Sequence, residues 1–470
     1  MEGAVMAIQL PEIVRELNIS EAAGNLAMTL LIATSGAVLV AVGRLADRFG
    51  RRRLCLVGIG LALAATIGVA SSWDAASLLI ARSVQGVANA MILTAVALLN
   101  HLFSSARGRS LAYAWFGAAM GVGLALAPLV GAAALDAGNW RFAFWINIPI
   151  LLVCLAGVWC WVPEKRAAGA PETVDVMGTV LLAGALLLAL ISISEGPRLG
   201  WWVARPAYSG PWPFAVSIAP ILMIVSLALF FCFGAVERWR LQRGLASLMD
   251  PTLLSVRSFG LGCAVSFLFV LGGFALQFII PLSGIYFWHM NTGAAGLLTA
   301  LMGIGIAAGG WTTLPLARHL GARSVVVLGI AIMIIGTSAL WGTMAWNPIL
   351  VGFSITLVAF GVGYGMTYSR ITEITLADVP AEKLGLASGM LVASRTCAMA
   401  LGAAGLTSII GVGRDWGSDS STPIIAVFGQ ALILSAVALL TALSLALLLR
   451  GGNDGLPKMA SASGAHRTAT

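Results

Sequence analysis

Residues 43–53 read Gly43-Arg44-Leu45-Ala46-Asp47-Arg48-Phe49-Gly50-Arg51-Arg52-Arg53, a hydrophilic stretch between two apolar runs. Six of its eleven residues are charged and five of these are arginines, although charged residues make up only 10% of the chain. Such a stretch lies in water or against anionic headgroups on the cytoplasmic side of a membrane. Gly43 and Gly50 allow a sharp backbone turn and a close approach of two helices. We interpret residues 43–53 as a cytoplasmic turn between two membrane spans.

The composition of the chain is that of a polytopic membrane protein. Of its 470 residues 59% are hydrophobic, whereas about half of a soluble chain is apolar and about a quarter is charged. The net charge of +8 comes from short loops, so it does not indicate nucleic acid binding. No P-loop sequence occurs, which argues against coupling to ATP. Histidines are scattered and no His, Asp or Cys cluster occurs, so we expect no cofactor, no metal site and no enzyme activity.

The apolar runs predict 14 membrane spans. The first run, of roughly 14 residues from Met1, is shorter than the 20 or so that a bilayer core requires, so we expect that this span begins upstream of Met1. The other runs cover residues 24–42, 54–71, 77–103, 110–134, 141–162, 176–194, 212–234, 259–287, 294–317, 324–343, 348–369, 386–412 and 423–449.

The positions of Lys and Arg predict the orientation. With an even number of spans both termini share one side, and the loops and tail on that side hold nineteen Lys and Arg against five on the other. Because cytoplasmic loops carry the excess of positive residues, we expect both termini in the cytoplasm of a cell that carries the protein in its plasma or inner membrane.

The charge of residues 43–53 would also suit a cytoplasmic loop that only orients the protein in the membrane. The order of the residues, however, points to a particular family. It closely resembles the loop between spans 2 and 3 of the major facilitator superfamily. All eight defining positions match, and the resemblance implies a role in gating the conformational change for this loop. The matching residues are Gly43, Leu45, Ala46, Asp47, Arg48, Gly50, Arg51 and Arg52.

The resemblance implies an all-α integral membrane fold, with two six-helix bundles around a central cavity. Fourteen spans fit if residues 176–194 and 212–234 are an inserted pair joined by an outer loop at residues 195–202, as in the 14-span drug:proton antiporter family. A weak echo of the charged turn at residues 316–323 agrees with two related halves. The expected parts are an N-terminal bundle at 1–165, the two extra spans at 166–245, a C-terminal bundle at 246–450, and a cytoplasmic tail at 451–470 that we expect to be disordered.

Arg82 is a charged residue near the start of a long apolar run. A buried guanidinium costs several kcal/mol unless it faces protein or water, so it is a candidate functional residue; the alternative is an arginine that snorkels to the interface. The Arg-x-x-Gln-Gly spacing places Arg82 and Gln85 on one helix face and makes Gly86 part of a flat packing strip. The segment resembles the family's fourth-span motif, which implies that Arg82 takes part in proton coupling.

The run at 110–134 is rich in glycine, a pattern usually explained by close helix packing. It also resembles the antiporter motif of the family's fifth span, which implies export. The match is partial because Ala127 and Ala132 replace two glycines. The residues that match are Gly123, Pro128 and Gly131, with a kink expected at the proline, and Gly121 belongs to the same glycine-rich helix.

Few carboxylates lie in the apolar runs. Glu2 stands where the family carries an acid in the first span, nine residues before Pro11, but it could also be a solvated terminal residue. Arg370 and Glu373 are three residues apart and can pair on one helix face, as a structural ion pair or as part of gating or coupling. Arg395 stands alone in a later run.

The sequence therefore predicts a transporter that exports small amphipathic drugs or antibiotics in exchange for protons, and we expect a monomer in the lipid bilayer. A proton-coupled uptake symporter is the main alternative, because the fifth-span motif is incomplete. A membrane sensor or scaffold that transports nothing is a third possibility.

Overall fold

The computed structural model describes residues 2–93, 95, 102, 106–164, 175–204, 214–243, 245, 252–288, 290, 292–345, 350–380, 383–413 and 424–449. Most of these residues form helices, and the only extended pairing among them is a single bridge between Val203 and Val216. Helices suit this sequence because the bilayer core offers no water to backbone N–H and C=O groups, which must therefore bond within the segment.

The first part of the chain forms α1 (Glu2–Glu16), α2 (Glu21–Phe49), α3 (Arg51–Ala70), α4 (Ala75–Leu93), α6 (Ala106–Asp136), α7 (Arg141–Trp145) and α8 (Asn147–Trp161). It is followed by α9 (Val176–Leu199) and α11 (Ile218–Gln242). The last part forms α12 (Thr252–Ser255), α13 (Arg257–Trp288), α14 (Thr292–Leu320), α15 (Ala322–Ala345), α16 (Leu350–Leu376), α17 (Leu384–Gly413) and α18 (Ile424–Leu448).

Every predicted apolar run overlaps a helix or, at 141–162, the pair α7 and α8, and most of the run 77–103 beyond Leu93 lies outside the described residues. Among the described residues, ten helices are long and apolar enough to cross a membrane, and shorter apolar segments lie at 26–39 and 386–402. The predicted count of 14 spans is thus not confirmed. The predicted outer loop at 195–202 begins later than expected, because α9 continues to Leu199 and ends at Gly200 with a φ of 91°.

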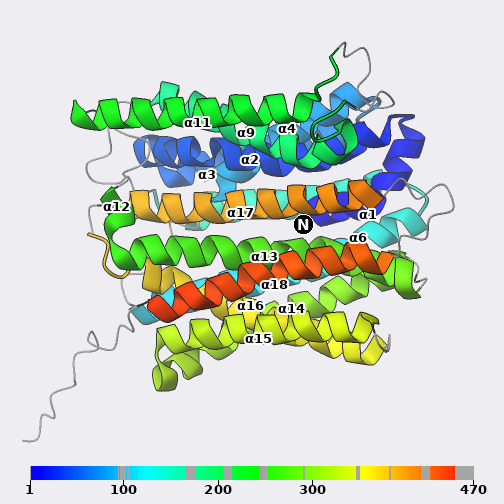
Figure 1. Cartoon of the computed structure of the whole chain (residues 1–470). Coiled ribbons are helices and arrows are strands. Elements are labelled where there is room, and N and C mark those ends of the chain that lie inside the picture. Colours follow the sequence, from blue (N-terminus) through cyan, green and yellow to red (C-terminus); the bar gives the residue numbers. More distant parts are fainter. Residues whose placement is uncertain are drawn as a thin grey trace, which may run out of the picture.

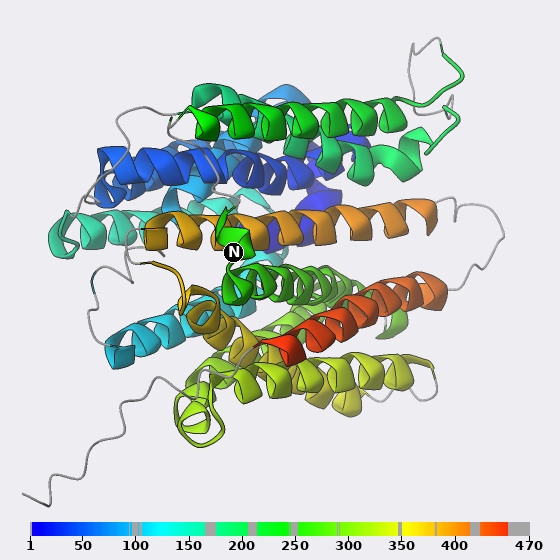
Figure 2. The same cartoon turned by 60° about the vertical axis from the view of Figure 1, so that its left-hand side comes forward.

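The long helices lie roughly side by side, with α11 at one edge of the bundle and α15 at the other in both views (Figures 1 and 2). Helix α2 packs on α4, α4 on α3, and α6 on α1. In the last part of the chain α16 packs on α14 and α15, while α13 packs on α17 and α18. The division into 1–165, 166–245 and 246–450 stays a prediction.

Three sets of contacts join the early helices to the late ones. Helix α6 packs along α14 and touches α16, α2 packs on α17, and α9 packs on both α2 and α17. Figure 1 shows α17 lying between the group around α2 and the group around α13. The α9–α11 pair therefore covers one line along which the two groups meet.

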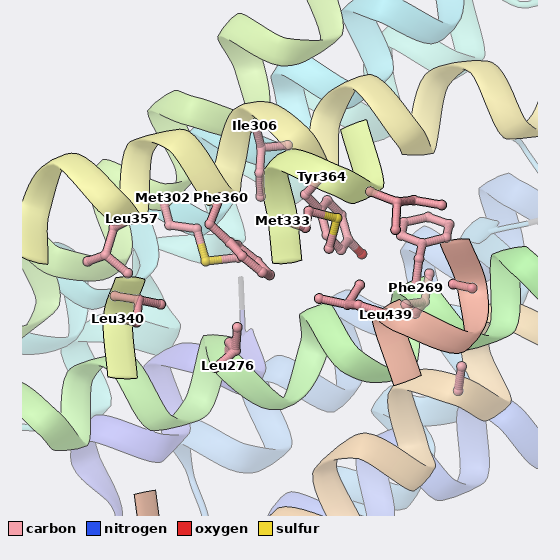
Figure 3. Close-up of a cluster of buried hydrophobic side chains, with 14 of the residues drawn as sticks. Phe269, Leu276, Met302, Ile306, Met333, Leu340, Leu357, Phe360, Tyr364 and Leu439 are labelled. Atoms are coloured by element: carbon pink, nitrogen blue, oxygen red, sulfur yellow. The ribbon is translucent and has the colours of Figure 1, made fainter. Parts of the chain in front are cut away.

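A large apolar core lies among α13, α14, α15, α16 and α18 (Figure 3). Its buried side chains include Phe269, Met302, Met333, Phe360 and Tyr364. A second core joins α1, α2, α3, α4, α6 and α7, so each group of helices has its own packed interior. A site built by both groups of helices would lie between these two cores.

Candidate functional site

The charged turn, residues 43–53, joins α2 to α3 at Gly50. This residue has φ 103° and ψ 130°, and its N–H donates to the carbonyl of Ala46 at 3.0 Å. A positive φ strains residues that carry a Cβ, and a Cβ here would also collide with the side chain of Glu164. The sharp turn expected from the sequence is therefore present at Gly50, where the close neighbour is the side chain of Glu164 and not a second helix.

The same expectation is wrong for Gly43. This residue lies inside α2, which continues as a helix to Phe49, so the backbone does not turn there. A Cβ built at Gly43 has no described atom within 4 Å. The turn requires only one glycine because the chain reverses in the single residue between α2 and α3.

Arginines of the turn hold the end of α8. The Nη2 of Arg52 donates to the carbonyl of Trp159 at 2.6 Å, and its guanidinium lies 5.7 Å from the ring centroid of Trp159. Arg53 pairs with Glu164 at 3.6 Å. The last carbonyls of a helix lack partners within the helix, and a cation there also suits the helix dipole. The turn thus caps the helix that closes the first part of the chain.

The other residues of the turn differ in exposure. Arg51 is buried, Arg48 is exposed, and Leu45 packs partly buried against an apolar cluster of α2, α3, α4 and α9. The side chain of Asp47 lies outside the described residues. The gating role of these residues therefore remains a prediction.

Arg82 forms a buried network that joins three helices. Its Nη1 donates to Gln85 Oε1 at 2.8 Å, and its Nε donates to the carbonyl of Ala27 on α2 at 3.2 Å. Gln85 Nε2 donates in turn to Thr66 Oγ1 on α3 at 3.2 Å. The exposed fractions are 0% for Arg82 and 1% for Gln85, so the arginine does not snorkel to an interface.

Close packing of α2 and α4 surrounds this network. A Cβ at Gly86 would collide with the Thr34 hydroxyl and the carbonyl of Leu31, both on α2. The flat strip expected at Gly86 therefore packs directly against a neighbouring backbone. This contact holds α4 in the position from which Arg82 reaches Ala27.

Helix α6 carries the expected fifth-span residues. It is helical from Ala106 to Asp136, and the carbonyl of Gly131 accepts a 3.3 Å hydrogen bond from Gln9 Nε2 on α1. A Cβ at Gly123 would meet no atom of the described residues within 4 Å. Details at Gly121 and at the side chain of Pro128 lie outside the described residues, as does the side chain of Glu2 on α1.

Arg370 and Glu373 form the pair that their spacing predicts. Arg370 Nη1 donates to Glu373 Oε2 at 2.7 Å near the end of α16, where the side chain of Arg370 is 7% exposed and that of Glu373 is 56% exposed. A role of this pair in gating or coupling stays a prediction.

Arg395 on α17 lies in a polar and aromatic setting that the sequence did not reveal. Its Nη2 donates to Thr372 Oγ1 at 2.8 Å and to Ser266 Oγ at 3.4 Å. Its guanidinium carbon lies 4.4 Å from the ring centroid of Tyr368. Arg395 is 5% exposed, so it is buried within the apolar helices, as Arg82 and Arg370 are.

Aromatic rings connect α6 to the late helices close to Arg395. Phe116 stacks on Tyr368, with ring centroids 6.5 Å apart and planes at 30°. Trp115 meets Trp311 of α14 edge to face at 5.3 Å. These contacts place aromatic side chains from both groups of helices at one interface.

The aromatic contacts continue into the core. Tyr364 stacks on Tyr368 at 6.2 Å and meets Phe269 edge to face at 5.4 Å. Figure 3 shows Tyr364 and Phe269 among the core side chains of α13 and α16. A signal was available in the sequence: two of the chain's five tyrosines stand four residues apart, on one face of a helix.

Comparison with known proteins decides the family. The model described as Major Facilitator Superfamily matches residues 1–290. The chain belongs to the major facilitator superfamily. It is therefore a multi-pass membrane transporter with the helical fold of that superfamily, and the family resemblance seen in the charged turn is confirmed.

Relatives and a solved structure agree with this assignment. The chain is 30% identical over 419 residues to the puromycin resistance protein of Streptomyces alboniger, covering 87% of this chain and 78% of that one. It is 28% identical over 428 residues to the probable actinorhodin transporter of Streptomyces coelicolor, covering 87% and 69%. It also shares the fold of the human organic anion transporter MFSD10, with a TM-score of 0.61, 15% identity, and coverage of 94% and 89%.

Proposed function

We propose that the protein exports small amphipathic drugs or antibiotics in exchange for protons, by alternating access between two six-helix bundles. The observation that carries the proposal is the buried network of Arg82, Gln85 and Thr66. A permanent charge kept inside apolar helices is costly and is usually retained for function. The names of relatives, which include antibiotic resistance and antibiotic transport, support export as the direction.

Arg82 would couple proton movement to substrate movement through its charge. A fixed positive charge lowers the proton affinity of a nearby carboxylate and so can time proton release. Glu2 is our candidate carboxylate in the early helices, and Glu373 with Arg370 is the candidate in the late ones. The charged turn would act as the latch between conformations, and helix α6, with Gly121, Gly123, Pro128 and Gly131, would be the helix that sets export.

The test uses purified protein in proteoliposomes with an imposed proton gradient and puromycin as the first substrate. We expect gradient-driven transport by the wild type, partial activity in Arg82→Lys, and loss of gradient dependence in Arg82→Gln. Lysine keeps the charge but lacks the planar donor fork of arginine. Arg238→Gln, a change of an exposed arginine on α11, is the matched control and should transport like the wild type.

The outcomes separate coupling from structure. Full gradient-driven transport by Arg82→Gln would show that Arg82 has only a structural role. Loss of transport together with loss of the folded peak in size-exclusion chromatography would not count as uncoupling, so binding of puromycin by the variant is measured in parallel.

Proton-coupled uptake is the second candidate, favoured by the alanines at 127 and 132 in the fifth-span motif. Ala127 is fully buried and Ala132 is 6% exposed, so both lie where helices pack. Transport in vesicles of known orientation distinguishes the directions: export requires puromycin to move opposite to protons, whereas uptake requires both to move together. Absence of transport of puromycin and of a panel of dyes would instead favour a sensor or scaffold.

A further inference from the structure

Arg395 is a buried charge well inside the long apolar helix α17. It lies about 11 residues from the start of α17 at Leu384, or about 16 Å at the helical rise, within a hydrocarbon core about 30 Å thick. Its protein acceptors are the neutral hydroxyls of Thr372 and Ser266. Its Nε is buried and has no hydrogen-bond partner among the described residues.

The acidic residue closest in sequence to these partners does not neutralise Arg395. Glu373 is bound to Arg370 at 2.7 Å. Arg370 stands two residues from both Tyr368 and Thr372, which places it on the opposite face of α16 from the two residues that contact Arg395. Within the described part of the chain Arg395 forms no ion pair, so an anionic group from outside the chain would complete its coordination.

An aromatic surface lies directly beside this charge. The guanidinium of Arg395 is stacked over Tyr368 at 4.4 Å, and Phe116 of α6 stacks on the same ring. Phe116 and Tyr368 are only half-buried, although the five residues that precede Tyr368 on α16 are buried. Because α6 and α16 belong to different groups of helices, a ligand held here would contact both.

We infer that Arg395, Tyr368 and Phe116 form a substrate subsite that binds an aromatic compound through its carboxylate, with Arg395 donating to the carboxylate and the two rings packing against the ligand. The inference rests on the proposed export function and names the charge class of one group of substrates. Arginine suits this role because it stays charged when buried and its planar fork matches a carboxylate.

The test compares two probes: a fluorescent aromatic dye that carries one carboxylate, and the methyl ester of the same dye. Binding is followed by fluorescence anisotropy with the full chain in nanodiscs, and empty nanodiscs serve as the blank. We expect the wild type to bind the acid at least tenfold more tightly than the ester. Arg395→Gln should remove this preference, whereas the control Arg238→Gln should keep it.

Two further variants keep the inference testable if Arg395→Gln does not fold. Arg395→Lys should weaken binding of the acid several-fold and leave the ester unchanged. Tyr368→Leu should weaken binding of both probes by a similar factor, because both carry the aromatic ring.

Other results would overturn the subsite. These are equal binding of acid and ester by the wild type, an unchanged preference in Arg395→Gln, or equal losses for both probes in Arg395→Lys. The export proposal fails separately: tight binding of the acid by a wild-type protein that moves no substrate in proteoliposomes would leave the subsite in place and refute export.

Discussion

Arg82 and Arg395, two of the buried arginines, differ in the groups that bind their guanidinium. Arg82 donates to an amide oxygen and a backbone carbonyl within the early helices, which fixes its position. Arg395 donates to two hydroxyls and stacks on a tyrosine at the interface with α6. Arg82 is enclosed by its own chain, which suits a role in proton coupling. Arg395 lies beside half-buried rings, which suits a role in ligand binding.

Arg52 provides a prediction at the residue scale. Its hydrogen bonds to the carbonyls of Trp159 and Val158 hold the end of α8 on the turn. A hydrogen bond from a charged donor contributes about 1.5–3 kcal/mol. Arg52→Gln should therefore lower the free energy of unfolding by about 1–3 kcal/mol, seen as a lower thermal midpoint of the purified protein in detergent.

Arg53 is the matched control for this prediction. It pairs with Glu164 at 3.6 Å, and its side chain is 62% exposed. Exposed ion pairs contribute about 0–1 kcal/mol, so Arg53→Gln should leave the midpoint nearly unchanged. Equal shifts of the thermal midpoint in Arg52→Gln and Arg53→Gln would show that the positive charge of the turn, and not the cap on α8, is the source of the stabilisation.

Helices in this protein approach closely where glycines remove the side chain from one face. Besides Gly86, the α14–α16 crossing uses such residues: a Cβ at Gly305 or Gly309 would collide with carbonyls of α16, and a Cβ at Gly361 or Gly365 would collide with carbonyls of α14. Small residues four apart allow this packing, which matters because lipid offers no hydrophobic force between helices. The crossings are therefore sensitive to single added methyl groups.

Gly86 provides the prediction at the scale of elements. Gly86→Ala forces α4 away from Thr34 and Leu31 of α2. Overpacking of this kind costs about 1–3 kcal/mol, so the thermal midpoint should fall. Proton-driven transport should fall as well, because Arg82 lies one helical turn away and depends on the same α2–α4 contact.

Gly60 on α3 is the control for Gly86. A Cβ there has no described atom within 4 Å, and the residue is exposed. Because alanine favours a helix by up to about 1 kcal/mol over glycine, Gly60→Ala should keep or raise the midpoint. An unchanged midpoint and unchanged transport in Gly86→Ala would contradict the close crossing of α2 and α4.

At the scale of the whole molecule, α9 packs where α2 meets α17, and α11 packs on α9. An ion pair of Arg240 with Asp175 at 3.2 Å joins the two helices, and the side chain of Asp175 is 2% exposed. The same carboxylate accepts from the N–H of Gly178 at 2.8 Å and caps α9. The pair thus forms one unit laid against both groups of helices.

Topology is the prediction at this scale. The excess of nineteen Lys and Arg over five predicts that both termini lie in the cytoplasm. Reporter fusions at residues 166 and 470 should be active inside the cell, and a fusion after Gly200, where α9 ends, should be active outside. An outward-facing C-terminus would contradict an even number of spans.

The sequence by itself determined the family, the helices and the conspicuous residues. Apolar runs predicted helix positions because a membrane span must bond its own backbone over about 20 apolar residues. Residues 43–53 predicted the superfamily through local residue order, and the match over residues 1–290 confirms it. Arg82 stood out because a charge in an apolar run is rare, and its bond to Gln85 follows from helical spacing alone.

Only the tertiary structure decided which helix faces meet. The partners Ala27 and Thr66 of the Arg82 network, the rings beside Arg395 and the location of α9 between α2 and α17 all join residues distant in sequence. Sequence periodicity does not reveal them, because a membrane helix is apolar toward lipid and toward its neighbours alike, so no stripe marks the packed face. Gly43 and Gly50 show the same limit locally: both are glycines of one motif, and only the folded backbone shows which of them turns the chain.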